Sequence, residues 1–222
     1  MADMTTRKSK TEVPTLVDLD GPQAERRLDA ETFVHAAFER AYGAHVQHFM
    51  PTLMSLRNDD DTLLAVLGLR IVDRQPLFLE QYLDRPVEQA LSAAAGLPVD
   101  RASLVEVGNF AVGAIGGGRW LITALTAYLF GTGHTWAVFT CGPELRNAFR
   151  RLGVELVDIA PADPGRLSPQ ECACWGRYYE QRPRVMAASV AQSYAVLSAL
   201  FEKECALNSL WTRAQLAGRN VA

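Results

Sequence analysis

The sequence predicts an α/β fold built on a mixed sheet that is flanked by helices, with a helical extension at the C-terminus. Two apolar runs separated by "NDDD" indicate an antiparallel hairpin, because turn residues between β-rich runs join neighbouring strands. Strands and helices alternate behind this hairpin, which requires crossovers and some parallel pairing. The tail, from residue 192 to residue 216, is helical throughout.

The first half of the chain supplies a strand, a helix, the hairpin and a second helix. Residues 15–20 form a short apolar run that ends at a Gly-Pro break, which is typical of a strand. Residues 24–44 carry apolar side chains near the helical period and include a stop at Gly43. The hairpin strands lie within residues 48–59 and 62–73. Residues 86–96 have proline in the first turn and glycine at the end, as helices do.

The second half alternates strand and helix. Strands are predicted at residues 103–112, 135–140, 154–159 and 184–190, and helices at residues 119–130, 143–153 and 168–180. The helix at 119–130 is apolar nearly all round and should therefore be buried. Ser168 followed by proline opens the helix at 168–180. We expect a polar, disordered leader over residues 1–14, one domain over residues 15–190 and the helical extension over residues 191–222.

Composition narrows the class of protein. A net charge of −3 gives no general electrostatic case for nucleic acid. The four cysteines match neither a secreted disulfide framework nor a zinc-ligand spacing, so we expect reduced thiols and no metal. The leader lacks the apolar segment of a signal peptide, and the sequence offers no uninterrupted apolar run of the ~18 residues that a membrane span needs. These features predict a cytoplasmic protein.

A glycine cluster, "GAIGGGR", joins the strand at 103–112 to the buried helix. After Val112 it places Gly113, Gly116, Gly117 and Gly118 ahead of Arg119. Glycines free the backbone for positive φ, and the helix N-terminus that follows directs amides and a positive dipole end outward. The cluster is therefore either an anion cradle or a structural turn. It is not a P-loop, because no Gly-Lys-Ser/Thr follows.

The order of elements around this turn resembles the GCN5-related N-acetyltransferase (GNAT) superfamily, whose central sheet is mixed and mostly antiparallel. The resemblance implies that the turn holds the pyrophosphate or phosphopantetheine of an acyl-CoA or acyl-carrier-protein thioester. Gly116 and Gly118 match the two small positions of the superfamily motif. Gly113 departs from its long polar position, and Arg119 offers a positive charge nearby. Phe149 stands where many members carry the tyrosine that protonates the departing thiolate.

Longer segments resemble the thermostable hemolysin family, a GNAT-like group related to acyl-homoserine-lactone synthases. They include "PLFLEQYLDRPVEQAL", "LVEVGNFAV", "WAVFTCGPELRNAFRRLG" and "WGRYYEQRPRVMA". By position, Glu106 matches the acidic residue that lactone synthases present on this strand, and Asn109 stands where arginine is common. Glu106 is therefore a candidate general base toward an amine acceptor in a gap between the central strands, or else a structural ion pair or helix cap.

Other residues are candidates for the site, and each of them also has a purely structural interpretation. Glu80, Tyr82 and Asp84 share one face if extended and could recognise an amine, or they form a solvated loop. Tyr178 and Tyr179, of which at most one should face the site, are candidates for the missing acid or for packing. Cys141 is a weak candidate nucleophile. Three arginines form either a docking patch for an acidic acyl carrier protein or a solvated face: Arg146, Arg150 and Arg151.

The function favoured by these features is transfer of an acyl group from a CoA or carrier-protein thioester to an amine. One rival is a hemolysin that acts on membranes directly or through a lipid-like product. The other is a GNAT-like protein that binds thioesters without turnover.

Overall fold

The computed structural model describes residues 13–72, 75–113, 116–201 and 205–221. Its strands form one seven-stranded sheet in the order β1-β2-β3-β4-β5-β7-β6. Within the described residues β4 and β5 are the one parallel pair, so the sheet is mixed and mostly antiparallel, as predicted. The strands are β1 (Leu16–Asp20), β2 (Thr52–Arg57), β3 (Leu63–Ile71), β4 (Leu104–Val112), β5 (Trp136–Cys141), β6 (Val157–Pro161) and β7 (Arg184–Ser189).

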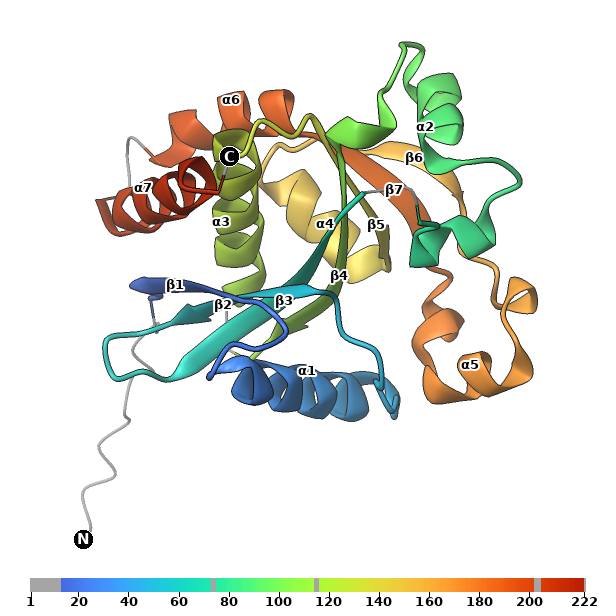
Figure 1. Ribbon diagram of the computed structural model, residues 1–222, viewed down its shortest axis with the longest axis horizontal. Helices are drawn as coiled ribbons and strands as arrows, with labels where there is room; N and C mark the ends of the chain where they lie inside the picture. Colours follow the sequence, from blue (N-terminus) through green and yellow to red (C-terminus); the bar gives the residue numbers. More distant parts are fainter. Residues whose placement is uncertain (1–12, 73–74, 114–115, 202–204, 222) are drawn as a thin grey trace, which may run out of the picture.

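Helices cover both faces of the sheet (Figure 1). One face packs against α3 (Gly117–Gly131), α4 (Pro143–Arg151), α6 (Val190–Phe201) and α7 (Cys205–Arg219). The other packs against α1 (Arg27–Tyr42), η1 (Phe78–Tyr82), α2 (Val87–Ala95) and α5 (Pro169–Cys174). Alternating strand residues divide between these faces, since Leu104 contacts the second set and Val105 the first.

The C-terminal extension packs directly on the domain. Leu210, Trp211 and Ala214 on α7 are buried in the same core as α3. Tyr194 on α6 stacks on Phe130 of α3 with ring centroids 3.6 Å apart. The apolar α3 is therefore enclosed between the sheet and the extension, which explains why its sequence is apolar nearly all round.

The sheet splits beside its parallel pair. β4 and β5 pair only from Leu104–Trp136 to Val107–Phe139. Beyond that point β4 continues with β3 as far as Val112, whereas Cys141 at the end of β5 pairs with β7. The two central strands therefore part, which opens the gap that the GNAT resemblance implied.

Two expectations about local structure are wrong. Residues 168–180 do not form one helix: α5 ends at Cys174, Gly176 has φ of 52°, and a 3₁₀ turn, η4 (Tyr178–Gln181), follows. The backbone turns here because the end of α1 approaches, and the Arg177 amide donates to the Tyr42 carbonyl at 2.8 Å. The segment around Glu80 is also not extended, since η1 is a 3₁₀ helix.

Candidate active site

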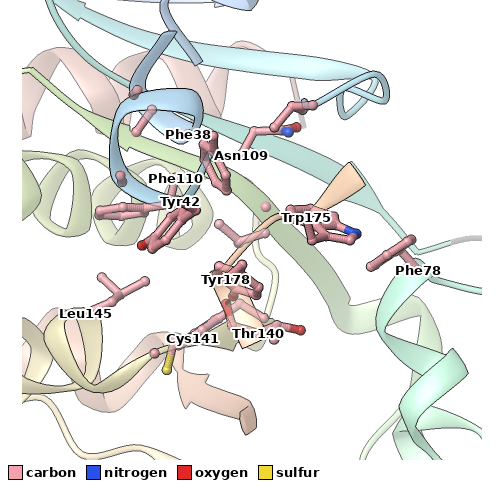
Figure 2. Close-up of a pocket in the computed structure, with 18 of the residues that line it drawn as sticks. Phe38, Tyr42, Phe78, Asn109, Phe110, Thr140, Cys141, Leu145, Trp175 and Tyr178 are labelled. Atoms are coloured by element: carbon pink, nitrogen blue, oxygen red, sulfur yellow. Dashed lines mark hydrogen bonds between the residues drawn. The ribbon is translucent and has the colours of Figure 1, made fainter. Parts of the chain in front are cut away.

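A cavity of about 620 Å³ occupies the gap between β4 and β5. Its walls come from both separated strands, from α1 and the residues after it, from α4, and from η1, α5 and η4. Aromatic rings gather over it, and Figure 2 shows Phe38, Tyr42, Trp175 and Tyr178 close together. The cavity surface is therefore largely apolar, and polar side chains such as Glu106, Glu171 and Gln181 also line it and could orient a ligand. We call it the first cavity.

Glu106 is the buried acid of the first cavity. Its side chain is 2% exposed, and its carboxylate accepts hydrogen bonds from the amides of Leu79 at 2.9 Å and Phe78 at 3.3 Å. Arg70 lies 3.8 Å away. Burial raises the pKa of Glu106 above its ordinary value, although the two amides and Arg70 act in the opposite direction. A buried carboxylate whose pKa is raised accepts a proton more readily than a solvated one, so this group can act as a general base.

Asn109 marks a bulge in β4 where the strands part. Gly108 faces Gly68 and Ala111 faces Val66, so two residues of β4 stand opposite one of β3. Asn109 has φ of 49°, which asparagine tolerates better than most residues. Its side-chain oxygen accepts from the Met50 amide at 2.9 Å, and its amide nitrogen donates to the His48 carbonyl at 3.3 Å. The bulge thus holds the segment after α1 over the first cavity.

The glycine cluster divides between two roles. Gly118 and Val112 line the first cavity, and a Cβ on Gly118 would meet only Phe110 at 3.9 Å. Gly116, with φ of 86°, caps α3, whose first amides precede the regular i-to-i−4 hydrogen bonds of the helix. A Cβ on Gly117 would lie 2.6 Å from Val112, so packing explains that glycine.

Of the positions that flank the cluster, Gly113 has a structural role and Arg119 has an exposed side chain. A Cβ on Gly113 would lie 2.8 Å from the Phe33 ring, and the Gly113 amide donates to Leu64 at 3.0 Å. Arg119 follows one residue after Gly118, and its amide donates to Gly116 at 3.0 Å. Residues 114 and 115 of the expected cradle lie outside the described residues.

Both Tyr178 and Tyr179 line the first cavity, so the expectation that at most one would face it is wrong. In the 3₁₀ turn η4 adjacent side chains are not forced to opposite sides as they are in a strand. The Tyr178 hydroxyl donates to the Thr140 carbonyl at 3.4 Å. The Tyr179 hydroxyl lies 2.5 Å from that of Tyr82. Burial raises the pKa of Tyr179 to about 12 and that of Tyr178 well above its ordinary value.

Phe149 and Cys141 also face the first cavity. Phe149 is buried and stacks on Phe139, with centroids 5.1 Å apart. It contributes an apolar side chain to the wall of the cavity. Burial raises the pKa of the Cys141 thiol to about 12, so it stays protonated and is a poor nucleophile at neutral pH.

The predicted acidic lip is not assembled. Glu80 bonds Arg101 at 2.7 Å and accepts from the amides of Val87 at 2.8 Å and Leu77 at 2.7 Å. Burial alone would raise its pKa, but these partners bring it below its ordinary value. Asp84 instead pairs with Arg166 at 2.6 Å. The 3₁₀ geometry of η1 turns these side chains apart, and Tyr82 alone among the three lines the first cavity.

The three arginines of α4 are not among the residues that line the first cavity. Arg146, Arg150 and Arg151 are exposed, while Leu145, Ala148 and Phe149 on the same helix line the cavity. This arrangement suits either a docking patch or a solvated face.

In the described part of the chain, histidine, cysteine and acidic side chains form no group of three that could hold a metal ion. No helix among the described residues is long and apolar enough to cross a bilayer.

Two features of the site were not predicted from the sequence: the cluster of aromatic rings over the first cavity and the bulge in β4. Phe38, Tyr42 and Trp175 come from two segments that meet only through tertiary contacts, such as the His45 amide donating to Cys174 at 2.7 Å. The bulge did leave a signal, because Gly108-Asn109 is a turn-forming dipeptide inside a β-rich run.

A mixed sheet that parts beside its parallel pair, with a glycine-capped helix after β4, defines a GNAT-like fold. The sequence profile of the thermostable hemolysin family matches residues 21–194, and the chain belongs to that family. A search of curated protein sequences finds no match.

Solved structures share the fold at low sequence identity. FeeM, an N-acyl amino acid synthase from uncultured soil microbes, is 16% identical, with a TM-score of 0.56 over 84% of this chain and 97% of FeeM. BjaI, a CoA-dependent acyl-homoserine lactone synthase solved with SAM and isopentyl-CoA, is 14% identical, with a TM-score of 0.54 over 90% and 99%. The AHL synthase LasI is 13% identical, with a TM-score of 0.53 over 83% and 94%.

Proposed function

We propose that the protein is an N-acyltransferase that moves an acyl group from an acyl-CoA or acyl-carrier-protein thioester to an amine. The observation that carries this proposal is the first cavity, which has a buried carboxylate, Glu106, on one strand and a glycine-capped helix, α3, at the end of the same strand. The names of FeeM and BjaI, which share the fold, point to the same class of reaction.

The donor fits the end of the cavity near α3. A pantetheine arm can approach past Gly118, where a side chain would intrude. Its phosphates would meet the first amides and positive dipole end of α3. The arm would then place its thioester between β4 and β5 beside the Asn109 bulge, where the extra residue of β4 interrupts the regular ladder.

The chemistry needs one proton acceptor and one leaving group. The amine nitrogen attacks the thioester carbon, the carbon–sulfur bond breaks, and the amine proton passes to Glu106 directly or through water. The departing sulfur leaves as thiolate or takes a proton from solvent or a tyrosine hydroxyl. The amine would enter past His45, His48 and Glu171, which give the first cavity a polar side.

The two candidate carriers of the thioester, CoA and an acyl carrier protein, make different demands on the protein. An acyl carrier protein would dock against the basic face of Arg146, Arg150 and Arg151, whereas CoA would rely on the α3 terminus alone. Replacing all three arginines by glutamate should therefore weaken acyl transfer from the carrier protein and leave acyl transfer from acyl-CoA unchanged.

Mass spectrometry tests the proposal. The purified protein is incubated with acyl thioesters of varied length and a library of amines, and free thiol is measured in parallel. The expected result is an N-acyl product formed in equal amount to free thiol and strongly reduced in Glu106→Gln. Thermal stabilisation by acyl-CoA without any product would favour a non-catalytic thioester-binding protein. Leakage from lipid vesicles without any thioester would favour a membrane-active hemolysin.

A further inference from the structure

A second cavity lies beside the first. It measures about 830 Å³ and is bounded by α2, by the segment after η1, and by residues of β6, the loop after it and the start of β7. Tyr82 and Tyr179 line both cavities, and they are the residues that the two linings share. The two spaces are therefore neighbours with a wall made of two side chains.

This wall is held together by one hydrogen bond. The hydroxyl oxygens of Tyr82 and Tyr179 are 2.5 Å apart, and the ring centroids are 6.4 Å apart. Tyr82 is 3% exposed and belongs to the core beneath η1. Tyr179 comes from η4, which is 97 residues away in sequence. One hydroxyl donates to the other, so both oxygens have a hydrogen-bond partner where the rings close this partly buried space.

The wall stands near the reacting groups of the proposed function. Glu106 bonds the amides of Phe78 and Leu79 at the start of η1, and Tyr82 lies about one 3₁₀ turn further along that helix. Between them the cavity surface is aromatic: the Phe78 ring lies 6.1 Å from Tyr82 and 5.8 Å from Trp175. Such a surface suits an alkyl chain rather than a charged group.

Resting on the proposed acyl transfer, we propose that Tyr82 and Tyr179 form the end wall of the acyl pocket and limit the length of the chain that the enzyme transfers. The second cavity supplies room directly behind the wall. Small side chains line the part of that room that α2 and β6 supply, namely Ala90, Ala93, Ala94, Ala160 and Ala162, while charged side chains such as Arg85, Asp163 and Arg184 line the rest. Removing one ring should join the two spaces and admit a longer apolar chain.

Tyr179 is the better ring to remove, because Tyr82 is more deeply buried in the core. Tyr179→Ala should shift the preferred acyl-CoA to a chain several carbons longer. Each additional methylene that becomes buried should improve binding about fourfold. Tyr179→Phe keeps the ring and removes only the hydroxyl, so its preferred length should match that of the parent protein.

Filling the second cavity gives a matched control. Ala90 lies on α2, behind the wall. Ala90→Phe alone should leave the length profile unchanged, because the chain does not reach it. Combined with Tyr179→Ala, it should return the preferred length toward that of the parent. A wall that merely supports the fold would show neither the shift nor its reversal.

The measurements are kcat/KM over a series of saturated acyl-CoA thioesters and Kd for the corresponding non-hydrolysable thioethers. The inference stands if Tyr179→Ala lengthens the preferred chain in both series and Ala90→Phe reverses the shift. It is overturned if the parent protein binds the thioethers but Tyr179→Ala, folded by circular dichroism, keeps the parent profile. Failure of the proposed function looks different, since the parent protein would then either bind no thioether of any length or bind thioethers without turning over the matching thioesters.

Discussion

The carboxylate of Glu106 accepts a hydrogen bond of 2.9 Å from the backbone amide of Leu79. The residue that we propose as general base is therefore also the acceptor for the first amides of η1, with Phe78 as its second donor. The same carboxylate can cap η1 and act as a base. Its two oxygens carry enough lone pairs to accept both amide hydrogen bonds and also a proton from the substrate. Substitution separates the two roles.

Glu106→Gln should lower turnover by ~10²–10⁴ while the affinity for thioester changes little. The amide side chain still offers one oxygen to η1 but cannot take up a proton at neutral pH. Steady-state kinetics and thioether binding measure the two effects separately. Loss of cooperative unfolding in this variant would instead show that Glu106 acts mainly as a structural cap.

The ionisation of Glu106 provides a second test, because a rise in pH should change the stability of the protein and its reaction rate in opposite directions. Burial raises its pKa in the folded protein, so the folded state holds the proton over a range in which the unfolded chain has lost it. The free energy of unfolding of the parent, relative to Glu106→Gln, should therefore fall as pH rises from about 4.3 through the raised pKa. The rate should rise over the same window as the base ionises. Denaturant titrations and a kcat/KM profile measure both, and parallel changes in the two would contradict the assignment.

The order of strands and helices could be predicted from the sequence because it depends on local periodicity and on glycine and proline signals. The hairpin of β2 and β3 and the Ser168 cap of α5 are confirmed, and Ser168 accepts from the Glu171 amide at 3.2 Å. The break of that helix before Tyr178 could not be predicted. It depends on the close approach of Tyr42 from α1, which no local pattern contains.

The same distinction applies to the candidate site. Glu106 could be found on its strand because its place in "EVGNFA" matches the acidic residue that lactone synthases present on the corresponding strand. Glu80 looked similar in sequence, yet Arg101, 21 residues later, bonds it at 2.7 Å and removes it from the cavity. The partner of a charged side chain is a tertiary property, so sequence alone could not separate the buried acid of the site from the acid of an ion pair.

Gly118→Val should abolish thioester binding while the protein remains folded. A Cβ at this position meets only Phe110 at 3.9 Å, and the branched side chain would project into the first cavity. Calorimetry with CoA and a pantetheine conjugate measures the loss, and thermal unfolding checks the fold. Gly117→Ala is the matched control. Its Cβ would lie 2.6 Å from Val112, so its main effect should be on the stability of the protein. Parent-like binding by Gly118→Val would place the donor elsewhere.

Glu80→Gln should destabilise the protein by about 2 kcal/mol without altering kcat, because it weakens bonds to Arg101 and to the amides of Val87 and Leu77. Glu88→Gln provides the comparison. Glu88 also bonds Arg101, at 2.8 Å, but no backbone amide donates to it among the contacts of the described residues. Its loss should cost less than about 1 kcal/mol. Equal effects in urea unfolding would contradict a structural role specific to Glu80.

The last prediction concerns the proton that Phe149 cannot donate. Burial raises the pKa of Tyr179 to about 12 and that of Tyr178 well above its ordinary value, whereas a departing thiol has a pKa of roughly 8.5. Proton transfer from either tyrosine to the thiolate is therefore unfavourable, and the thiolate can leave unprotonated near neutral pH. We expect Tyr178→Phe and Tyr179→Phe to lower kcat by less than about tenfold. Phe149→Tyr, which places a hydroxyl in the first cavity next to Phe139, should raise the rate if it is accommodated. Single-turnover kinetics with free-thiol detection measures this step. A loss of ~10² or more in either Tyr→Phe variant, with unfolding unchanged, would identify that tyrosine as the acid.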